Sequence, residues 1–437
     1  MSEKKNDKQL LQDILKELGR EKDFPKILDR RKTRFENGKI TRLDLSRLML
    51  EQFTNKIINL RALQRLDLSY NKLQVLPEEI GYLKNLRRMD LRANRLSSLP
   101  ETIPGLVNLR KLDLRENFIE LLPQGIEKLR KLKELKLDSN PLDSLPKSTI
   151  KLKKLRFLSL RKMNFLVLPE QVCHLKRLEI LDLGSNYLTT LPEKIGLLQN
   201  LQFINLQKNR MIDLPQEIVH LDLKRLDFRD NRFKEIPPQL WEVQSLERID
   251  IVSNQLTAIS EKIDQLTNLY DLRLYDNKIR ELPESLCDLP QLYRLEVQYN
   301  ELSSLPLSIG KLAKLQELML NNNQLTSLPA SICELAELQL IYLDFNKLEK
   351  LPSDISKLQN LRELSANNNE LEAFPEQIDN LEKLERLDLQ NNELINLPES
   401  LVKLPSLSHL WINGNPLSSK SEKIISDLKQ KGCKVDI

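Results

Sequence analysis

Residues 63–83 read LQRLDLSYNKLQVLPEEIGYL, and this stretch decides the fold because its pattern returns along most of the chain. The pattern is Leu-x-x-Leu-x-Leu-x-x-Asn-x-Leu, followed by Leu-Pro-x-x-Ile-x-x-Leu. Its asparagine recurs every 23 residues, with one spacing of 22, at Asn71, Asn94, Asn117, Asn140, Asn186, Asn209, Asn231, Asn254, Asn277, Asn300, Asn323, Asn346, Asn369, Asn392 and Asn415. Met163 takes the asparagine position of one more repeat, and a degenerate repeat opens the array at Ile40, which gives 17 repeats.

Each repeat predicts a short strand with one buried face, because Leu-x-x-Leu-x-Leu alternates with period two. One repeat is too small to bury its own leucines, so neighbouring repeats must stack and their strands form a parallel sheet. The asparagine amide can satisfy backbone groups of its own turn and of the next one, as a ladder through the stack. The Leu-Pro step starts an extended return segment, and Ile-x-x-Leu suits a helical turn against the core.

These motifs resemble the leucine-rich repeat family, in its 23-residue class, over residues 40–418. The resemblance implies an α/β fold, a right-handed leucine-rich repeat solenoid (horseshoe) with a parallel β-sheet on its concave face, which works as a recognition scaffold. The consensus sequence of the repeat is similar to that of intracellular Ras-group and scribble-type repeats and of many bacterial repeat proteins. It is unlike the 20-residue repeats of bacterial ubiquitin-ligase effectors.

The open ends of such an array need caps, since terminal repeats would otherwise expose their core. We expect an N-terminal helical cap over residues 1–39, because residues 8–18 place leucine and isoleucine on one helical stripe before Gly19. The solenoid of about 17 repeats is expected over residues 40–418. Residues 419–437 are expected to form a C-terminal cap, a helix plus a short strand. A helix that binds a partner is the alternative for either end.

Composition narrows the class of protein. The 437 residues include 40% hydrophobic but only 5% aromatic residues, fewer aromatics than a compact enzyme of this size would carry. Ten glycines argue against glycine-rich phosphate loops, and a net charge of +5 does not by itself predict nucleic-acid binding. The charged start lacks an apolar run, so no secretory signal is expected, and no stretch of about 18 apolar residues suggests a membrane span. We expect a cytoplasmic protein, with signal-free secretion as the open alternative.

Cysteine and histidine positions predict structural roles. Cys287 and Cys333 fall at one repeat phase two repeats apart, roughly 9–10 Å, beyond the roughly 7 Å reach of a disulfide. His174 and His220 are likewise two repeats apart, too far to share a metal ion. No metal-binding or nucleophile motif occurs, and the repeats leave no room for a catalytic domain. We therefore expect no enzyme activity, no cofactor and no metal.

Residues between the strand leucines face solvent on the concave side, so their chemistry is informative. Residues 84–165 carry 20 basic and 9 acidic side chains, whereas residues 281–420 carry 11 basic and 21 acidic ones. The basic inner positions include Arg88, Arg92, Arg115 and Arg161. One interpretation is a lattice of surface ion pairs with the column of Asp67, Asp90 and Asp113. The other is electrostatic steering of an acidic protein partner.

An apolar column interrupts these charges. Phe157, Ile180 and Phe203 take the same outward position in three successive repeats, and Gly184 is expected to leave open space beside them. Exposed contiguous apolar surface marks interaction sites, unless a cap or loop covers it. A third stretch offers Arg229, Tyr275 and Tyr342 as further binding residues. Met163 and the short repeat that follows Asn209 suggest a local change of curvature.

These features predict a non-catalytic scaffold that binds a protein or peptide on its concave face. The resemblance to Ras-group repeats suggests a role in intracellular signalling. The alternative is a secreted bacterial effector or adhesin that binds host proteins. Neither nucleic acid nor a membrane is an expected partner, and the sequence leaves the oligomeric state open.

Overall fold

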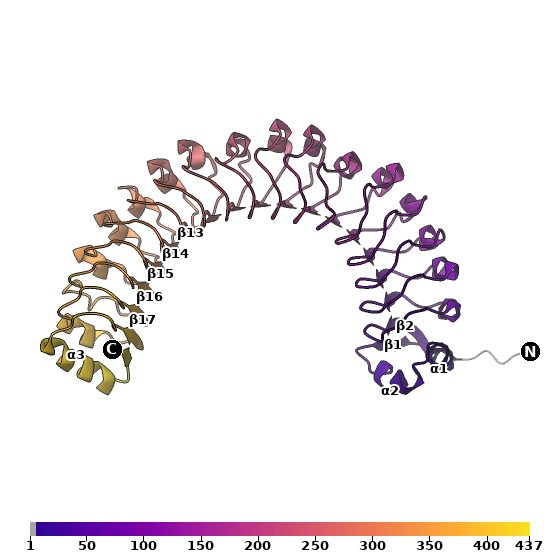
Figure 1. Ribbon diagram of the computed structural model, residues 1–437, viewed down its shortest axis with the longest axis horizontal. Helices are drawn as coiled ribbons and strands as arrows, with labels where there is room; N and C mark the ends of the chain where they lie inside the picture. The colour runs from indigo at the N-terminus through magenta and orange to yellow at the C-terminus, as the bar shows by residue number, and fades with distance from the viewer. Residues whose placement is uncertain (1–5) are drawn as a thin grey trace, which may run out of the picture. The chain divides into compact units, whose positions relative to one another are not determined.

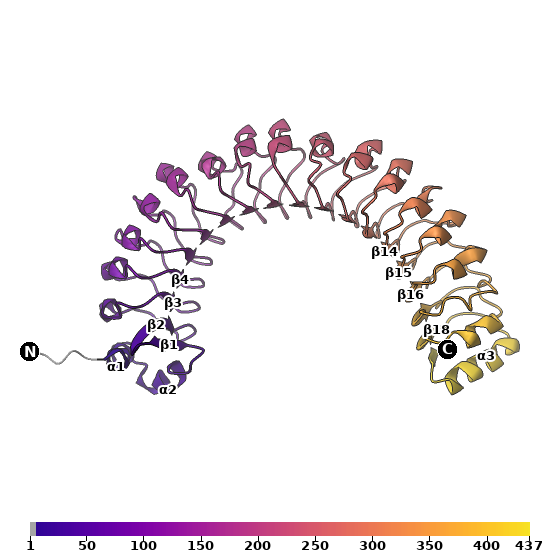
Figure 2. The same cartoon turned by 180° about the vertical axis from the view of Figure 1, so that it is seen from behind.

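The computed structural model describes residues 6–437, so the charged start at residues 1–5 lies outside it. The chain divides into two compact units. Unit 1 comprises the residues up to Arg210 together with Leu214–Leu223, and unit 2 comprises Met211–Asp213 with Lys224–Ile437. The division falls in the one repeat of 22 residues, between Asn209 and Asn231. Figures 1 and 2 show both units from opposite sides.

Unit 1 begins with helical segments and a strand before its regular repeats start. Helices α1 (Asp7–Glu17), η1 (Glu21–Asp23) and α2 (Phe24–Ile27) come first. Strand β1 (Thr33–Glu36) then pairs antiparallel with β2 (Lys39–Asp44). The sequence did not indicate β1, whose pairing covers one edge of the sheet. The remaining strands run parallel to β2 and are β3 (Arg65–Asp67), β4 (Arg88–Asp90), β5 (Lys111–Asp113), β6 (Glu134–Lys136), β7 (Phe157–Ser159), β8 (Ile180–Asp182) and β9 (Phe203–Asn205).

Unit 2 continues the same repeat, and its strands run parallel to one another. Its strands are β10 (Arg225–Asp227), β11 (Arg248–Asp250), β12 (Asp271–Arg273), β13 (Arg294–Glu296), β14 (Glu317–Met319), β15 (Leu340–Tyr342), β16 (Glu363–Ser365), β17 (Arg386–Asp388) and β18 (His409–Trp411). Helix α3 (Ser419–Gln430) and strand β19 (Lys434–Asp436) follow, and β19 pairs parallel with β18.

The return segments, except the one between β16 and β17, form short 3-10 helices rather than turns of α-helix. In unit 1 they are η2 (Asn55–Asn59), η3 (Glu78–Tyr82), η4 (Ile103–Gly105), η5 (Ile126–Lys128), η6 (Lys147–Lys151), η7 (Glu170–His174), η8 (Glu193–Leu197) and η9 (Gln216–His220). In unit 2 they are η10 (Pro238–Glu242), η11 (Glu261–Gln265), η12 (Glu284–Asp288), η13 (Ile309–Lys311), η14 (Ala330–Glu334), η15 (Ser353–Lys357) and η16 (Glu399–Lys403). In each unit they lie on the outer side, and the strands lie on the inner side (Figure 1). Each of these helices is only three to five residues long, a length at which the 3-10 turn is common.

The predicted asparagine ladder is present in both units. Asn94 is typical, because its Oδ1 accepts a hydrogen bond from Leu73 N at 3.0 Å, and its Nδ2 donates to Leu68 O at 3.0 Å and Leu91 O at 2.9 Å. The residue before it, Ala93, has a φ of 53°, which turns the chain sharply after the strand. Each asparagine therefore ties its own turn to the preceding repeat and leaves fewer buried backbone groups unpaired.

Leucines of successive strands stack in register and fill the core. Leu158 lies opposite Leu181, which lies opposite Ile204, and all three are fully buried. The residues on either side of each strand leucine point the other way and line the inner face. The predicted fold class, an α/β solenoid with a parallel sheet on the inner face, is confirmed.

Candidate protein-interaction surface

The apolar column, defined as Phe157, Ile180 and Phe203, lies on the inner face of unit 1. These residues open β7, β8 and β9, and the strand register places Phe157 opposite Ile180 and Ile180 opposite Phe203. Neighbouring strands are about 4.8 Å apart, so the three side chains form one patch, as predicted. All three are half-buried rather than enclosed. Helix α1 packs on β2 and η2, at the other end of the same sheet, and does not cover the column.

Charged side chains border the apolar column. Lys136 Nζ lies 5.3 Å from the centre of the Phe157 ring, a cation–π contact at the side of β6. Arg156 pairs with Glu179 at 3.0 Å, next to the start of the same strands. An apolar centre with a polar and cationic rim is the usual anatomy of a protein-interaction surface.

The expected open space beside Gly184 is not there. A Cβ atom on Gly184 would lie 2.8 Å from a guanidinium nitrogen of Arg161, so the arginine already fills that space. Arg161 reaches across because its guanidinium pairs with Asp182, at 3.3 Å, on the next strand. The glycine therefore accommodates an ion pair of the protein itself, and the prediction of a vacant position was wrong.

Two further predicted arginines are neutralised within their own strands. Arg115 pairs with Asp113 at 2.6 Å, and Arg92 lies 3.6 Å from Asp90. The hydrogen bond and charge of Asp113 raise the pKa of Arg115 above its ordinary value. In both pairs the arginine follows the aspartate by two positions, so the chain itself brings them together. For these residues the interpretation as a lattice of ion pairs describes the structure.

The fourth predicted arginine, Arg88, has a different setting. It is exposed, and its position on β4 lies opposite Arg65 on β3, which in turn lies opposite Arg42 on β2. Arg42 and Arg65 were not among the predicted site residues. The sequence could have indicated them, because Arg42, Arg65 and Arg88 occupy the same position in three successive repeats.

The predicted residues of unit 2 do not form one cluster. Arg229 is paired with Asp227 at 2.6 Å. Tyr342 is half-buried and its hydroxyl donates to Glu363 at 2.7 Å, while burial and this bond raise its pKa to about 12. Tyr275 is half-buried two repeats beyond Arg229, and Tyr342 stands three repeats farther on. Between them, Arg248, Arg273 and Arg294 belong to a continuous network of ion pairs with carboxylates of their own and neighbouring strands.

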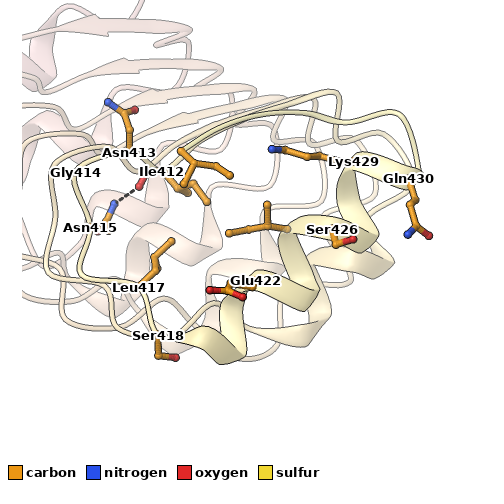
Figure 3. A pocket seen from close by; sticks show the side chains of 12 residues that line it. Ile412, Asn413, Gly414, Asn415, Leu417, Ser418, Glu422, Ser426, Lys429 and Gln430 are labelled. Atoms are coloured by element: carbon orange, nitrogen blue, oxygen red, sulfur yellow. Dashed lines mark hydrogen bonds between the residues drawn. The ribbon is translucent and has the colours of Figure 1, made fainter.

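The end of unit 2 holds a pocket that the sequence did not indicate. It has a volume of about 820 Å³ and lies between α3 and the loop that follows β18 (Figure 3). Ile412 and Ile425 form part of its apolar floor, and both are buried. Glu422 and Lys429 of α3 stand at its rim, where both are exposed. Asn415, the last ladder residue, donates to Ile412 O at 2.8 Å beside it.

The described part of the chain offers no metal centre. Within residues 6–437 no group of three or more His, Cys, Asp or Glu side chains is arranged to hold a metal ion. All four cysteines are buried free thiols, and burial raises the pKa of Cys173 and of Cys333 to about 11. No helix over the same residues is both long and apolar enough to cross a membrane.

Comparison with known proteins agrees with the repeat. The profile described as "Leucine-rich repeat region" matches residues 40–145 and 284–373, and related leucine-rich repeat profiles match residues 244–302 and 383–404. None of the curated proteins matches the chain in sequence.

Solved structures share both the fold and part of the sequence. A leucine-rich repeat protein of Leptospira interrogans is 36% identical, with a TM-score of 0.79, over 91% of this chain and 95% of its own. The plant peptide hormone receptor RGFR1, solved in complex with RGF2, is 27% identical with a TM-score of 0.67, over 88% of this chain and 64% of the receptor chain. YopM from Yersinia enterocolitica is 26% identical with a TM-score of 0.60, over 94% and 87% of the two chains.

Proposed function

The chain belongs to the leucine-rich repeat family, and on this premise we propose that it binds a protein or peptide partner on the inner sheet face of unit 1. The family is generally non-catalytic and works as a protein-interaction scaffold, and we assign the same class of role to this chain. Three residues, the apolar column of Phe157, Ile180 and Phe203, are the proposed centre of the contact.

The observation that carries this proposal is the column itself. Most inner positions of unit 1 carry charged or polar side chains, but three adjacent strands present phenylalanine, isoleucine and phenylalanine side by side. Burying such a patch against a partner removes apolar surface from water, which contributes about 25 cal/mol per Å². None of the three belongs to the buried core, which the strand residues between them fill.

Rigidity supports the same role. The column sits on parallel strands whose turns are fixed by the asparagine ladder, so its spacing is set before a partner arrives. A preorganised surface loses little ordering entropy on binding, and more of the contact energy therefore appears as affinity. The complex of RGFR1 with RGF2 shows that a related fold can recognise a protein or peptide ligand.

We assign the place of action to a reducing compartment, with a role in cytoplasmic signalling. Four buried free thiols support this choice, because disulfides are characteristic of oxidising compartments. The alternative function, a secreted bacterial protein that binds host proteins, is favoured by similarity to leucine-rich repeat proteins of two bacteria. Detection in culture supernatant rather than in the cell lysate would decide for the alternative.

The proposal is tested by affinity capture with a double variant, Phe157→Asp with Phe203→Asp. Its matched control is Leu121→Asp with Val167→Asp, which changes two apolar residues that are 70% and 71% exposed and lie outside the strands of the same unit. We expect the column variant to lose the partners that wild type and control retain. Retention of every partner by a column variant that unfolds like wild type would refute the proposed site.

A further inference from the structure

We propose that Arg42, Arg65 and Arg88 form a binding site for carboxylates, which takes an acidic segment of the protein partner. We call these three residues the arginine column. The inference rests on the proposed function and extends it, because it assigns a chemical character to the part of the partner that lies over β2, β3 and β4.

The arginine column brings three cations together without counter-ions. Strand register sets Arg42 opposite Arg65 and Arg65 opposite Arg88, at the strand spacing of about 4.8 Å. Within residues 6–437 no carboxylate oxygen lies within 4.0 Å of the three guanidinium groups. The next residue along the column, Lys111, is different, because it pairs with Glu134 on the neighbouring strand.

The adjacent aspartates do not neutralise the arginine column, because other donors hold them. Asp67 accepts hydrogen bonds from the hydroxyl and the backbone N–H of Ser69, at 2.6 and 2.9 Å. Asp44 accepts from Ser46 at 2.7 Å and from Lys32 at 3.3 Å. On β4, the residue two positions after the aspartate is an arginine instead of a serine, and Arg92 lies 3.6 Å from Asp90. In each repeat the aspartate is engaged by the residue two positions later, which leaves the arginine two positions earlier unpaired.

Like charges at this spacing repel one another, so the arrangement costs stability. The charge of Arg88, followed by partial burial and the charges of Arg42 and Arg34, lowers the pKa of Arg65. The negative charge of a bound carboxylate would offset the repulsion among the three guanidinium groups. Each guanidinium can also donate two parallel N–H hydrogen bonds to a carboxylate. A row of cations that the fold does not itself use is therefore well suited to an anionic ligand.

A depression in the inner face provides the space. A cavity of about 360 Å³ is lined at one side by Arg42, Arg65 and Arg88. The rest of its charged lining mixes cations with carboxylates: Arg92, Lys111, Arg115 and Lys136 with Asp67, Asp90, Asp113 and Glu134. Arg65 is four strand steps from Phe157, or about 19 Å along the sheet. An extended peptide covers that distance with about six residues. The partner segment we infer therefore has its carboxylates about six residues away from its apolar anchor.

Carboxylates fit this surface better than a polyphosphate chain does. The arginine column covers two strand steps, about 10 Å, and Glu134 follows Lys111 in the same row, so a longer run of phosphates would meet a carboxylate. A short acidic segment can place its carboxylates over the arginine column alone.

The test uses a fluorescently labelled oligo-glutamate peptide as probe, measured by anisotropy at low ionic strength. The double variant Arg65→Gln with Arg88→Gln is compared with Arg95→Gln with Arg130→Gln, which removes the same charge from exposed arginines outside the strands. We expect the first variant to bind about tenfold more weakly and the second to change less than about twofold. Thermal unfolding should show that the first variant is as stable as wild type or more so.

Equal weakening in both variants would show non-specific charge attraction and overturn the inference. Tighter binding of a single-stranded oligonucleotide of equal charge, or full displacement by the same concentration of inorganic sulfate, would overturn the assignment to a carboxylate peptide. The variant Phe157→Asp with Phe203→Asp should leave oligo-glutamate binding within about twofold, after allowance for its added charge. If this phenylalanine variant loses partner capture but still binds oligo-glutamate, both proposals stand. If it loses both partner capture and oligo-glutamate binding, the inference alone is overturned, because the probe then binds elsewhere than on the arginine column.

Discussion

Asn186 holds two backbone amides of the repeat that contains Met163. Its Oδ1 accepts hydrogen bonds from Met163 N at 2.9 Å and from Phe165 N at 3.2 Å. A regular ladder asparagine such as Asn117 accepts from one such amide, that of Leu96, at 3.0 Å. The asparagine that follows an irregular repeat therefore compensates for the missing one.

The same compensation occurs at the start of the array. Asn71 accepts from both Leu48 N and Leu50 N, at 3.0 Å each, and Leu48 is the other residue in an asparagine position that is not asparagine. Arg47 and Met49, on either side of Leu48, both have positive φ. Lys162 and Asn164 repeat this arrangement around Met163, with φ of 53° and 60°. Two left-handed residues thus turn the amide toward the next repeat when the local side chain cannot hold it.

Replacing Asn186 by alanine should therefore cost more than replacing Asn117. Both variants lose the Nδ2 bonds, but Asn186→Ala leaves two buried amides unpaired where Asn117→Ala leaves one. An unpaired buried donor costs about 1–3 kcal/mol, so the free energy of unfolding should drop further by about 1 kcal/mol in the Asn186 variant. Urea denaturation of both variants measures the difference. Equal losses would mean that the second amide of the Met163 repeat finds another partner.

Asp90 should make unit 1 less stable above pH 6 than below pH 4. Burial, followed by the charges of Asp113 and Asp67, raises its pKa from the ordinary 3.8 to about 6. Because the folded state binds this proton more tightly than the unfolded state, stability falls as the pH rises from about 4 to about 6. The side chain is 27% exposed, so we expect a contribution of about 1–2 kcal/mol.

Asp90→Asn should remove that contribution. The amide oxygen can still accept the hydrogen bond from Arg92 N, at 3.1 Å. We expect the variant to unfold at higher denaturant concentration than wild type above pH 6 and to converge with it below pH 4. If the difference in denaturation midpoint between the variant and wild type does not depend on pH, burial and the neighbouring carboxylates do not raise the pKa of Asp90.

The four cysteines should react slowly in the native protein. Burial raises the pKa of Cys173 and of Cys333 to about 11, so little thiolate forms at neutral pH. With a thiol reagent such as dithionitrobenzoate, we expect all four thiols to react only after denaturant is added. Fast reaction of one thiol before unfolding would locate a part of the chain that opens on its own.

The outward positions of the strands were predictable because a period-two strand allows one register. Once Leu158, Leu181 and Ile204 must fill the core, Phe157, Ile180 and Phe203 have to line the inner face together. The asparagine ladder follows from the same logic. The parallel sheet and the apolar column could therefore be predicted from the spacing of residues, and the resemblance to the leucine-rich repeat family supplied the solenoid.

The pairing of long side chains could not be predicted in this way. Arg161 reaches the next strand to meet Asp182, whereas Arg115 bonds Asp113 on its own strand, and the spacing of residues does not distinguish the two. A count of net charge does not reveal Arg42 and Arg65, because the negative charges of Asp44 and Asp67 cancel theirs in the sum. Only the bonds of those aspartates to other donors show that the arginines remain unpaired.

Site-specific photo-crosslinking tests the proposed site most directly. Benzoylphenylalanine placed at Ile180, the centre of the apolar column, should crosslink to a protein or peptide partner. The same group placed at Val167, exposed but outside the strands of unit 1, should not. Crosslinks at Val167 with none at Ile180, in protein that binds its partner normally, would contradict recognition on the inner face.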